Sequence, residues 1–483
     1  MIENTGKTIR AWEQDPGKGG QPDGGGLLDR PVPVTDQTPF PTQITGTAPP
    51  ADNYSPGTPG FRYWAAADAL RRTSDFWGGL LKKHAWHPKV GATLRVILDE
   101  GVDLNAYYDR HALNFFHAAV HGRMVFSGES PDIVCHEFGH AILDSIRPQL
   151  WDVAAFEPPA FHESFGDMSA ILTALQLPSV RTGVLQETND AVYRSSRLSR
   201  LAEQLGWAIR QSFPDAVEPD CLRNAVNSFF YQNPDDLPTS APGDSLSSEP
   251  HSFSRVFTGA FFHALGLMFA SSATNPTEAD LQRVSVDMGA ILIGAIRLSP
   301  VVPEYFAQIG AHMIKVANAK SGAYGDAIKT AMVKHGILSV PGIAAVGSDL
   351  VQLNAATGVA AAPPSLSDQE LDISSFGFSV DKIYAASANE AKRFGVAGAA
   401  PTSGDTRSQP GDRVALGYFE DLIRRGKLDD GGFADPQKSV AFSRTVKTHR
   451  LEKAGDRVLL RRVRIDCGFR STAANAARPA GTR

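Results

Sequence analysis

The chain has 483 residues, of which 42% are hydrophobic and 20% charged, which is the composition of an ordinary soluble protein with room for more than one domain. Its net charge of −5 is too small to indicate a nucleic-acid-binding protein, and no apolar run is long enough to span a bilayer. Three cysteines give no disulfide framework, and the first residues lack a Sec-type signal peptide, so we expect a protein that is cytoplasmic or exported without such a signal.

The first part of the sequence predicts an extended arm followed by a compact region. Residues 1–60 are rich in Gly, Pro, Asp and Thr, which indicates an arm with at most short strands, or plain disorder as the alternative. From Phe61 to Leu81 apolar residues recur at helical spacing. Three short runs at 94–98, 114–116 and 124–126 are typical of strands. We expect a small mixed sheet packed against the helix.

The next predicted helix contains the pattern H-E-x-x-H. It should begin after Ser130, a suitable N-cap, and end before Pro148. His136 and His140 are four residues apart and share one helix face, so their imidazoles can bind one Zn²⁺. Glu137 lies beside them, where it can take a proton from a metal-bound water.

A further helix, after Pro158-Pro159, supplies two acids. Glu163 and Asp167 are four residues apart on one face, among large apolar residues. A catalytic zinc takes three protein ligands and keeps one position open, so Glu163 would complete a His-His-Glu set. Asp167 would accept the second ring N–H of a ligand histidine. A solvated helix with two unrelated acids is the alternative.

The rest of the chain is predicted to be helical at first and rich in linkers afterwards. Residues 190–212 have the spacing of an amphipathic helix. Past Leu338, Gly, Ala, Ser and Pro dominate 339–370 and 395–412, which indicates linkers. Two partly alternating runs around Gly455-Asp456 predict a β-hairpin. Helical runs are also expected at 253–271, 277–297, 303–319 and 323–336.

Several of these segments together resemble one known family. H-E-x-x-H followed by E-x-x-x-D is similar to the gluzincin metallopeptidases, in particular the thermolysin-like family, over about residues 61–338. Leu222-Arg223 resembles the pair that lines the primed-side pocket and braces the substrate carbonyl. His251 resembles the histidine that stabilises the transition state. Asn114-Phe115-Phe116 resembles the N-A-F edge strand that holds the substrate backbone.

The resemblance implies an α+β fold of two lobes with the active-site cleft between them. The N-terminal lobe, residues 61–150, would hold the mixed sheet and end in the H-E-x-x-H helix. The C-terminal lobe, residues 151–338, would be all-helical. Residues 1–60 and 339–483 lie outside the resemblance, so a chain ending near Pro341 should fold on its own.

The resemblance also implies a zinc-dependent metalloendopeptidase with one Zn²⁺ per chain and a peptide or protein substrate. His136, His140 and Glu163 would be the ligands, and Glu137 the general base. Trp151 lies near the position of a family tyrosine that donates to the oxyanion, and its indole N–H can donate as well. A buried core tryptophan is the alternative. Calcium is not implied, because the acidic clusters that bind it in secreted relatives have no clear counterpart.

Three other functions stay open. A gluzincin aminopeptidase would need acids that hold the free amine, and the sequence has no G-x-M-E-N-like segment. A catalytically inactive binding protein on the same scaffold would need neither Glu137 nor His251, so their presence argues against it. A self-processing toxin or effector is not distinguished by the sequence, and neither is the oligomeric state.

Overall fold

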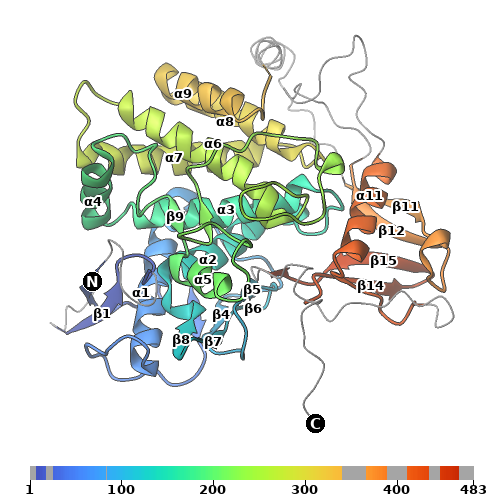
Figure 1. The fold of residues 1–483 in the computed structure, drawn as a ribbon, viewed down its shortest axis with the longest axis horizontal. Coiled ribbons are helices and arrows are strands. Elements are labelled where there is room, and N and C mark those ends of the chain that lie inside the picture. Colours follow the sequence, from blue (N-terminus) through green and yellow to red (C-terminus); the bar gives the residue numbers. More distant parts are fainter. Residues whose placement is uncertain are drawn as a thin grey trace.

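The structure is a computed structural model that describes residues 7–17, 26–82, 84–339, 366–388, 411–434 and 446–466. Its fold is mixed α+β, with packed helices and several separate sheets (Figure 1), which confirms the class predicted from the sequence. The described helices are α1 (Pro59–Leu81), α2 (Pro131–Ile146), α3 (Glu157–Ala174), α4 (Pro178–Thr188), α5 (Glu203–Arg210), α6 (Pro250–Ala270), α7 (Glu278–Leu298), α8 (Tyr305–Lys320), α9 (Gly322–Lys334) and α11 (Gly411–Arg424).

The larger N-terminal sheet is mixed, as predicted. β3, β4 and β6 run parallel to one another, whereas β5 and β16 are antiparallel to their neighbours. β16 comes from the far end of the chain, and Asn105 beside β5 is hydrogen-bonded to Asp466, 361 residues away. The strand order is β16-β5-β6-β4-β3, made of β16 (Ile465–Asp466), β5 (Ala106–Tyr108), β6 (Ala112–Phe115), β4 (Leu94–Ile97) and β3 (Thr42–Ile44).

Asn114 lies on an inner strand, so its predicted position on an edge strand is wrong. β6 pairs with β4 on one side and with β5 on the other. The buried Asn114 amide lies within 3.4 Å of the carbonyl oxygens of Tyr107 and Ala112. β5 is the strand that contacts α2, and Asn105-Ala106-Tyr107 matches the N-A-aromatic pattern more closely. In the described sheet β5 also has a neighbour on each side, β6 and the two-residue β16.

The described part of the N-terminal arm belongs to the fold. β1 (Thr8–Trp12) pairs antiparallel with β2 (Leu27–Pro31), and β3 joins the larger sheet. Trp12 is buried, and its ring packs edge-on against Phe61 of α1 with centroids 5.8 Å apart. Two further short strand pairs lie outside the arm. They are β7 (His117–Val120) with β8 (Arg123–Phe126) and β9 (Arg200–Leu201) with β10 (Arg223–Asn224).

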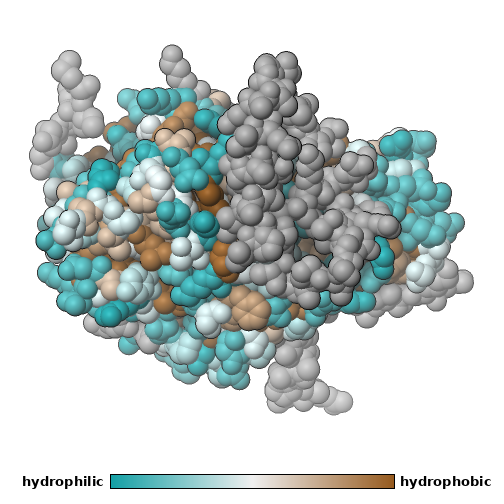
Figure 2. Space-filling view, turned by 90° about the horizontal axis from the view of Figure 1, so that it is seen from above, coloured by the Kyte–Doolittle hydropathy of each residue, from teal (hydrophilic) through white to brown (hydrophobic). Residues whose placement is uncertain are grey.

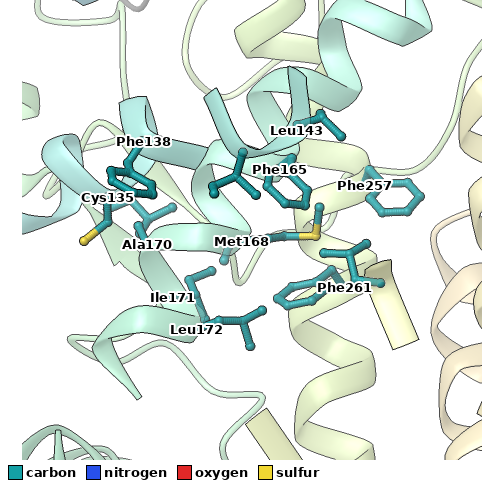
Figure 3. Close-up of a cluster of buried hydrophobic side chains, with 14 of the residues drawn as sticks. Cys135, Phe138, Leu143, Phe165, Met168, Ala170, Ile171, Leu172, Phe257 and Phe261 are labelled. Carbon is teal, nitrogen blue, oxygen red and sulfur yellow. The ribbon is translucent and has the colours of Figure 1, made fainter. Parts of the chain in front are cut away.

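α2 and α3 pack closely because small residues meet at their contact. Ser130 caps α2 by accepting a hydrogen bond from Ile133 N, as predicted. A Cβ on Gly139 of α2 would lie 3.2 Å from Gly166 Cα of α3, so neither position has room to spare. Figure 3 shows the apolar side chains that fill the space among α2, α3 and α6, including Phe138, Leu143, Phe165, Met168, Phe257 and Phe261.

Helices α6 to α9 confirm the predicted helical runs between 253 and 336. The prediction for 190–212 is wrong over most of its length, since only Glu203–Arg210 is helical. Ala202 has the left-handed φ of 50°, and the residues before it pair with β10. An α-helix cannot continue through such a residue. By length and composition α6 resembles a membrane span, but 83% of its most apolar window is buried inside the fold, as in a core helix.

The C-terminal extension contains more than the predicted hairpin. β14 (His449–Ala454) and β15 (Arg457–Arg462) form that hairpin, with Gly455 at a φ of 65° in the turn. The linkers predicted at 339–370 and 395–412 lie mainly outside the described residues. The hairpin belongs to a five-stranded sheet of order β11-β12-β15-β14-β13, whose other strands are β11 (Ser367–Asp372), β12 (Lys382–Ser387) and β13 (Leu428–Asp429).

This C-terminal unit, residues 366–388, 411–434 and 446–466, lies beside the rest of the fold in Figure 1 and shares a core with it. Phe156, just before α3, is buried against Tyr418 of α11, with ring centroids 5.6 Å apart. Ala154 N donates to Ala386 O over 2.9 Å. The structure therefore argues against the expectation that the residues before Pro341 fold independently.

Polar residues are interspersed with apolar ones over the described part of the face in Figure 2. Large exposed apolar side chains such as Val102, Tyr193 and Phe230 come from separate segments. Single exposed apolar residues of this kind are normal on protein surfaces.

Candidate metal centre

Two histidines of α2 and one glutamate of α3 face one another. His136 Nε2 lies 3.3 Å from Glu163 Oε2, and His140 Nε2 lies 3.8 Å from Glu163 Oε1. The two imidazole rings are nearly perpendicular, with centroids 4.6 Å apart. All three side chains are buried. The packing of α2 on α3 thus gathers three ligand-type groups in one enclosed place.

Two imidazoles and one carboxylate could hold a metal ion, and zinc accepts such a donor set. Ligand atoms roughly 2.0–2.1 Å from a tetrahedral zinc are about 3.4 Å from one another, close to the separations above. Atoms of His136, Glu137 and His140 also lie within 4.8 Å of one another. However, Glu137 is rotated by about 100° from His136 on the helix, whereas Glu163 faces both histidines from the opposite helix. The geometry therefore favours Glu163 over Glu137 as the third ligand.

Asp167 lies behind His136, on the far side of its ring from Glu163. His136 Nδ1 is 3.0 Å from Asp167 Oδ1. Arg223 donates three hydrogen bonds to the same carboxylate, over 2.8, 3.0 and 3.2 Å. A carboxylate in this position fixes the orientation of the ring and leaves Nε2 facing Glu163.

These contacts set the charges of the group. Burial raises the pKa of Glu163, but His251 and His140 outweigh it and lower the pKa to about 2. Burial lowers the pKa of His136, whereas its contacts with Asp167 and Glu163 raise it to about 9. Burial holds the pKa of His140 well below its ordinary value. A cation bound here would replace the proton of His136, which leaves two neutral imidazoles and one carboxylate.

His251 stands at the start of α6, on another side of Glu163. Its Nε2 lies 3.2 Å from Glu163 Oε2, and its Nδ1 lies 2.6 Å from Glu249 Oε1. Burial lowers the pKa of His251, but these two carboxylates raise it above its ordinary value. Glu249 also caps α6 by accepting a hydrogen bond from Ser252 N. Glu249 was not predicted from the sequence, although an acid two residues before the proposed histidine was a usable signal.

Leu222 and Arg223 line a small pocket beside Glu137, which is where the sequence analysis expected a substrate pocket. The pairing of β10 with β9 holds their backbone in place. The pocket contains about 20 Å³ of space, enough for about one water molecule. A larger side chain would enter only if the wall moved. The apolar part of that wall consists of Ala106, Ile133, Ala170, Leu201, Ala202, Leu205 and Leu222.

Trp151 is a buried core residue, and its predicted role as an oxyanion donor is wrong. Its indole N–H donates to Arg462 O over 3.0 Å, and the Arg462 guanidinium donates back to Trp151 O over 2.8 Å. The indole has a single N–H, so none is left for a substrate. Asn114, on β6, also lies apart from the group, since it hydrogen-bonds within the sheet.

No protein-family model matches this chain, and no curated protein matches it. A functional assignment therefore depends on the geometry of the site itself.

Proposed function

We propose that the protein is a zinc-dependent metalloendopeptidase with a two-lobed, thermolysin-like arrangement. The mixed sheet with α1 would be one lobe and helices α6 to α9 the other, with α2 and α3 between them. The observation that carries the proposal is the position of Glu163, whose carboxylate faces Nε2 of both His136 and His140. A catalytic zinc needs such a third ligand from outside the H-E-x-x-H helix.

The roles of the residues follow from their positions. His136, His140 and Glu163 would hold one Zn²⁺, which when bound polarises a carbonyl and lowers the pKa of water. Glu137, buried beside His136, would take the proton of the attacking water as general base and deliver it to the leaving amine. His251 would donate a hydrogen bond to the oxyanion, since two carboxylates favour its protonated form.

The substrate would be a peptide or protein. Arg223, held by Asp167, would bind the carbonyl on the leaving side of the cut bond. Leu222 and its apolar neighbours would receive the side chain that follows this bond once the pocket wall moves to make room. The protein is predicted to be cytoplasmic, or exported without a Sec-type signal, and calcium is not implied; these stay predictions.

The first test combines metal analysis with cleavage of a mixed peptide library. The purified protein should carry about one zinc per chain, and a chelator should abolish cleavage. Glu137→Gln should keep the zinc while kcat falls by roughly 10²–10⁴-fold, because the base and not a ligand is lost. Mass spectrometry of the products separates internal cleavage from removal of N-terminal residues, which an aminopeptidase would show. Zinc binding without any turnover would instead support an inactive binding protein.

A further inference from the structure

The outer strand next to the candidate site is covered by the end of this same chain. β16 pairs antiparallel with β5, so that Ile465 lies opposite Tyr108 and Asp466 opposite Tyr107. β16 therefore points toward Ala106, the next residue of β5. Ala106 lines the pocket that also contains Glu137 and Arg223, so the covered edge leads directly to the candidate site.

A strand edge of this kind, when it is uncovered, is a binding place for an extended peptide. A peptide can add itself as a new strand, with main-chain hydrogen bonds supplying affinity and pockets supplying specificity. On β5, such a peptide would pass Tyr108 and Tyr107 before it reached the pocket beside Glu137. β16 lies on that path. A substrate strand and β16 cannot pair with the same two residues at once.

β16 is held mainly by polar contacts and makes few apolar ones. Asp466 accepts hydrogen bonds from Asn105 Nδ2 over 2.8 Å and from Lys427 Nζ over 3.0 Å. The guanidinium of Arg464 lies 4.4 Å from the centre of the Tyr107 ring. Among the described residues of this segment, Ile465 adds the one apolar side chain in the main core. The two-residue ladder and these contacts hold β16 more weakly than the shared core at Phe156 holds the rest of the C-terminal unit.

The C-terminal unit also touches the opposite border of the site. Ser248, next to the residue that binds His251 Nδ1, donates to Asp421 of α11 over 2.9 Å. Burial raises the pKa of Glu249, but His251 and, to a smaller extent, Arg425 just after α11 lower it below its ordinary value. The same unit thus contacts β5 on one side of the candidate site and the start of α6 on the other.

We propose that residues 464–466 are a built-in peptide that occupies the substrate edge of β5, so that the site is latent until this segment is released. That the ligand of this edge is a substrate rests on the proposed function, but the occupation of the edge is tested without any turnover. If the edge of β5 is uncovered in only a fraction of the molecules, the apparent affinity for an added peptide is reduced by that fraction.

The test uses the full chain with Glu137→Gln, so that a bound peptide is not cut. Asp466→Lys removes both contacts of the carboxylate and places a like charge beside Lys427. Lys427→Ala is the milder second variant, which removes one of these contacts without changing the sequence of β16. Glu452→Lys makes the same change of charge on an exposed position of β14 and serves as the matched control. The probe is a labelled synthetic peptide with the sequence of residues 461–466, Arg-Arg-Val-Arg-Ile-Asp.

Hydrogen exchange and peptide binding are measured together. We expect the amides of residues 106–108 to exchange faster in Asp466→Lys and Lys427→Ala than in the parent. We also expect these two variants to bind the probe at least about tenfold more tightly than the parent and Glu452→Lys do. Added probe should restore protection at 106–108. Unchanged exchange in both release variants overturns the proposal, as does faster exchange without tighter binding.

The same variants with Glu137 intact connect this result to the proposed function. Release should raise kcat/KM on the peptide library by about tenfold or more, and Glu452→Lys should not change it. Tighter binding with no turnover in any variant would leave the occupied edge established and reject the peptidase. Measurable turnover that is equal in all variants would show that β16 does not limit the site, and this too overturns the proposal.

Discussion

At the scale of single residues, Glu163 and Asp167 share one face of α3 but meet different atoms. Glu163 faces Nε2 of both histidines of α2, whereas Asp167 lies at Nδ1 of His136 and pairs with Arg223. The proposed function gives Glu163 the role of a ligand and Asp167 the role of orienting a ligand. This difference gives an order of effects that a plain surface helix would not show.

Glu163→Ala should remove most of the bound zinc, because only two protein ligands remain. Asp167→Asn should weaken zinc binding by about 10–100-fold without abolishing it, since it only loses the contact that orients His136. Titration with a competing chelator measures both affinities, and circular dichroism confirms that each variant is folded. If Asp167→Asn lost the metal while Glu163→Ala retained it, the two roles would be exchanged.

Glu129 is a buried acid outside the site, and it makes stability depend on pH. Burial raises its pKa to about 7, against the opposing effects of Gly57 N–H and Arg62. The folded state therefore keeps a proton that the unfolded state releases above its ordinary pKa of 4.5. The free energy of unfolding should fall as the pH rises from about 4.5 to 7, by about 1–3 kcal/mol from this group.

Glu129→Gln should remove this part of the pH dependence, because a neutral amide still accepts the hydrogen bond of Gly57. Urea unfolding at pH 5 and pH 8 should show the variant gaining stability relative to the parent at the higher pH. Glu452→Gln, an exposed replacement of the same kind, is the control. An equal difference between parent and Glu129→Gln at both pH values would contradict the prediction.

At the scale of elements, local signals in the sequence predicted what local forces decide. The cap at Ser130 and the spacing of apolar residues located α2 correctly. The helix predicted at 190–212 failed because a left-handed backbone at Ala202 interrupts an otherwise helical pattern of apolar residues. The edge strand was predicted at Asn114, but β6 has a neighbour on each side, and the nearby β5 is another short strand with similar letters. Only the order of pairing in the sheet distinguishes them.

The contact between α2 and α3 yields a prediction about the site. A Cβ on Gly166 would lie 2.5 Å from His136 Cε1, and Asp167 prevents the ring from moving away. Gly166→Ala should therefore turn the ring and weaken zinc binding by about 10–100-fold, the usual effect of a misplaced ligand. Gly79→Ala, where a Cβ would meet nothing within 4 Å, is the matched control and should leave zinc binding unchanged. Full zinc affinity in Gly166→Ala would contradict the proposed position of His136.

At the scale of the whole molecule, pairings between distant segments decided what the sequence could not. No local pattern links Asp466 to Asn105, or Arg462 to Trp151, because each contact joins residues more than 300 positions apart: 361 in the first case and 311 in the second. The sequence therefore predicted that the C-terminal extension does not belong to the core of the rest of the fold. The structure instead shows a common core at Phe156 and Tyr418.

This shared core reverses the expected result of truncation. A chain that ends at Ser339 should be clearly less stable than the full chain, because Phe156, Ala154 and the Trp151 indole lose their partners. In the full chain, Phe156→Ala should cost about 3–5 kcal/mol, as for a large buried ring. In the truncated chain the same replacement should cost much less, since the ring is already uncovered. Such non-additivity, measured by urea unfolding of the four proteins, identifies Phe156 as part of the interface with the C-terminal unit. Equal stability of the two chain lengths, with the same cost of Phe156→Ala in both, would show that residues up to 339 bury their own core.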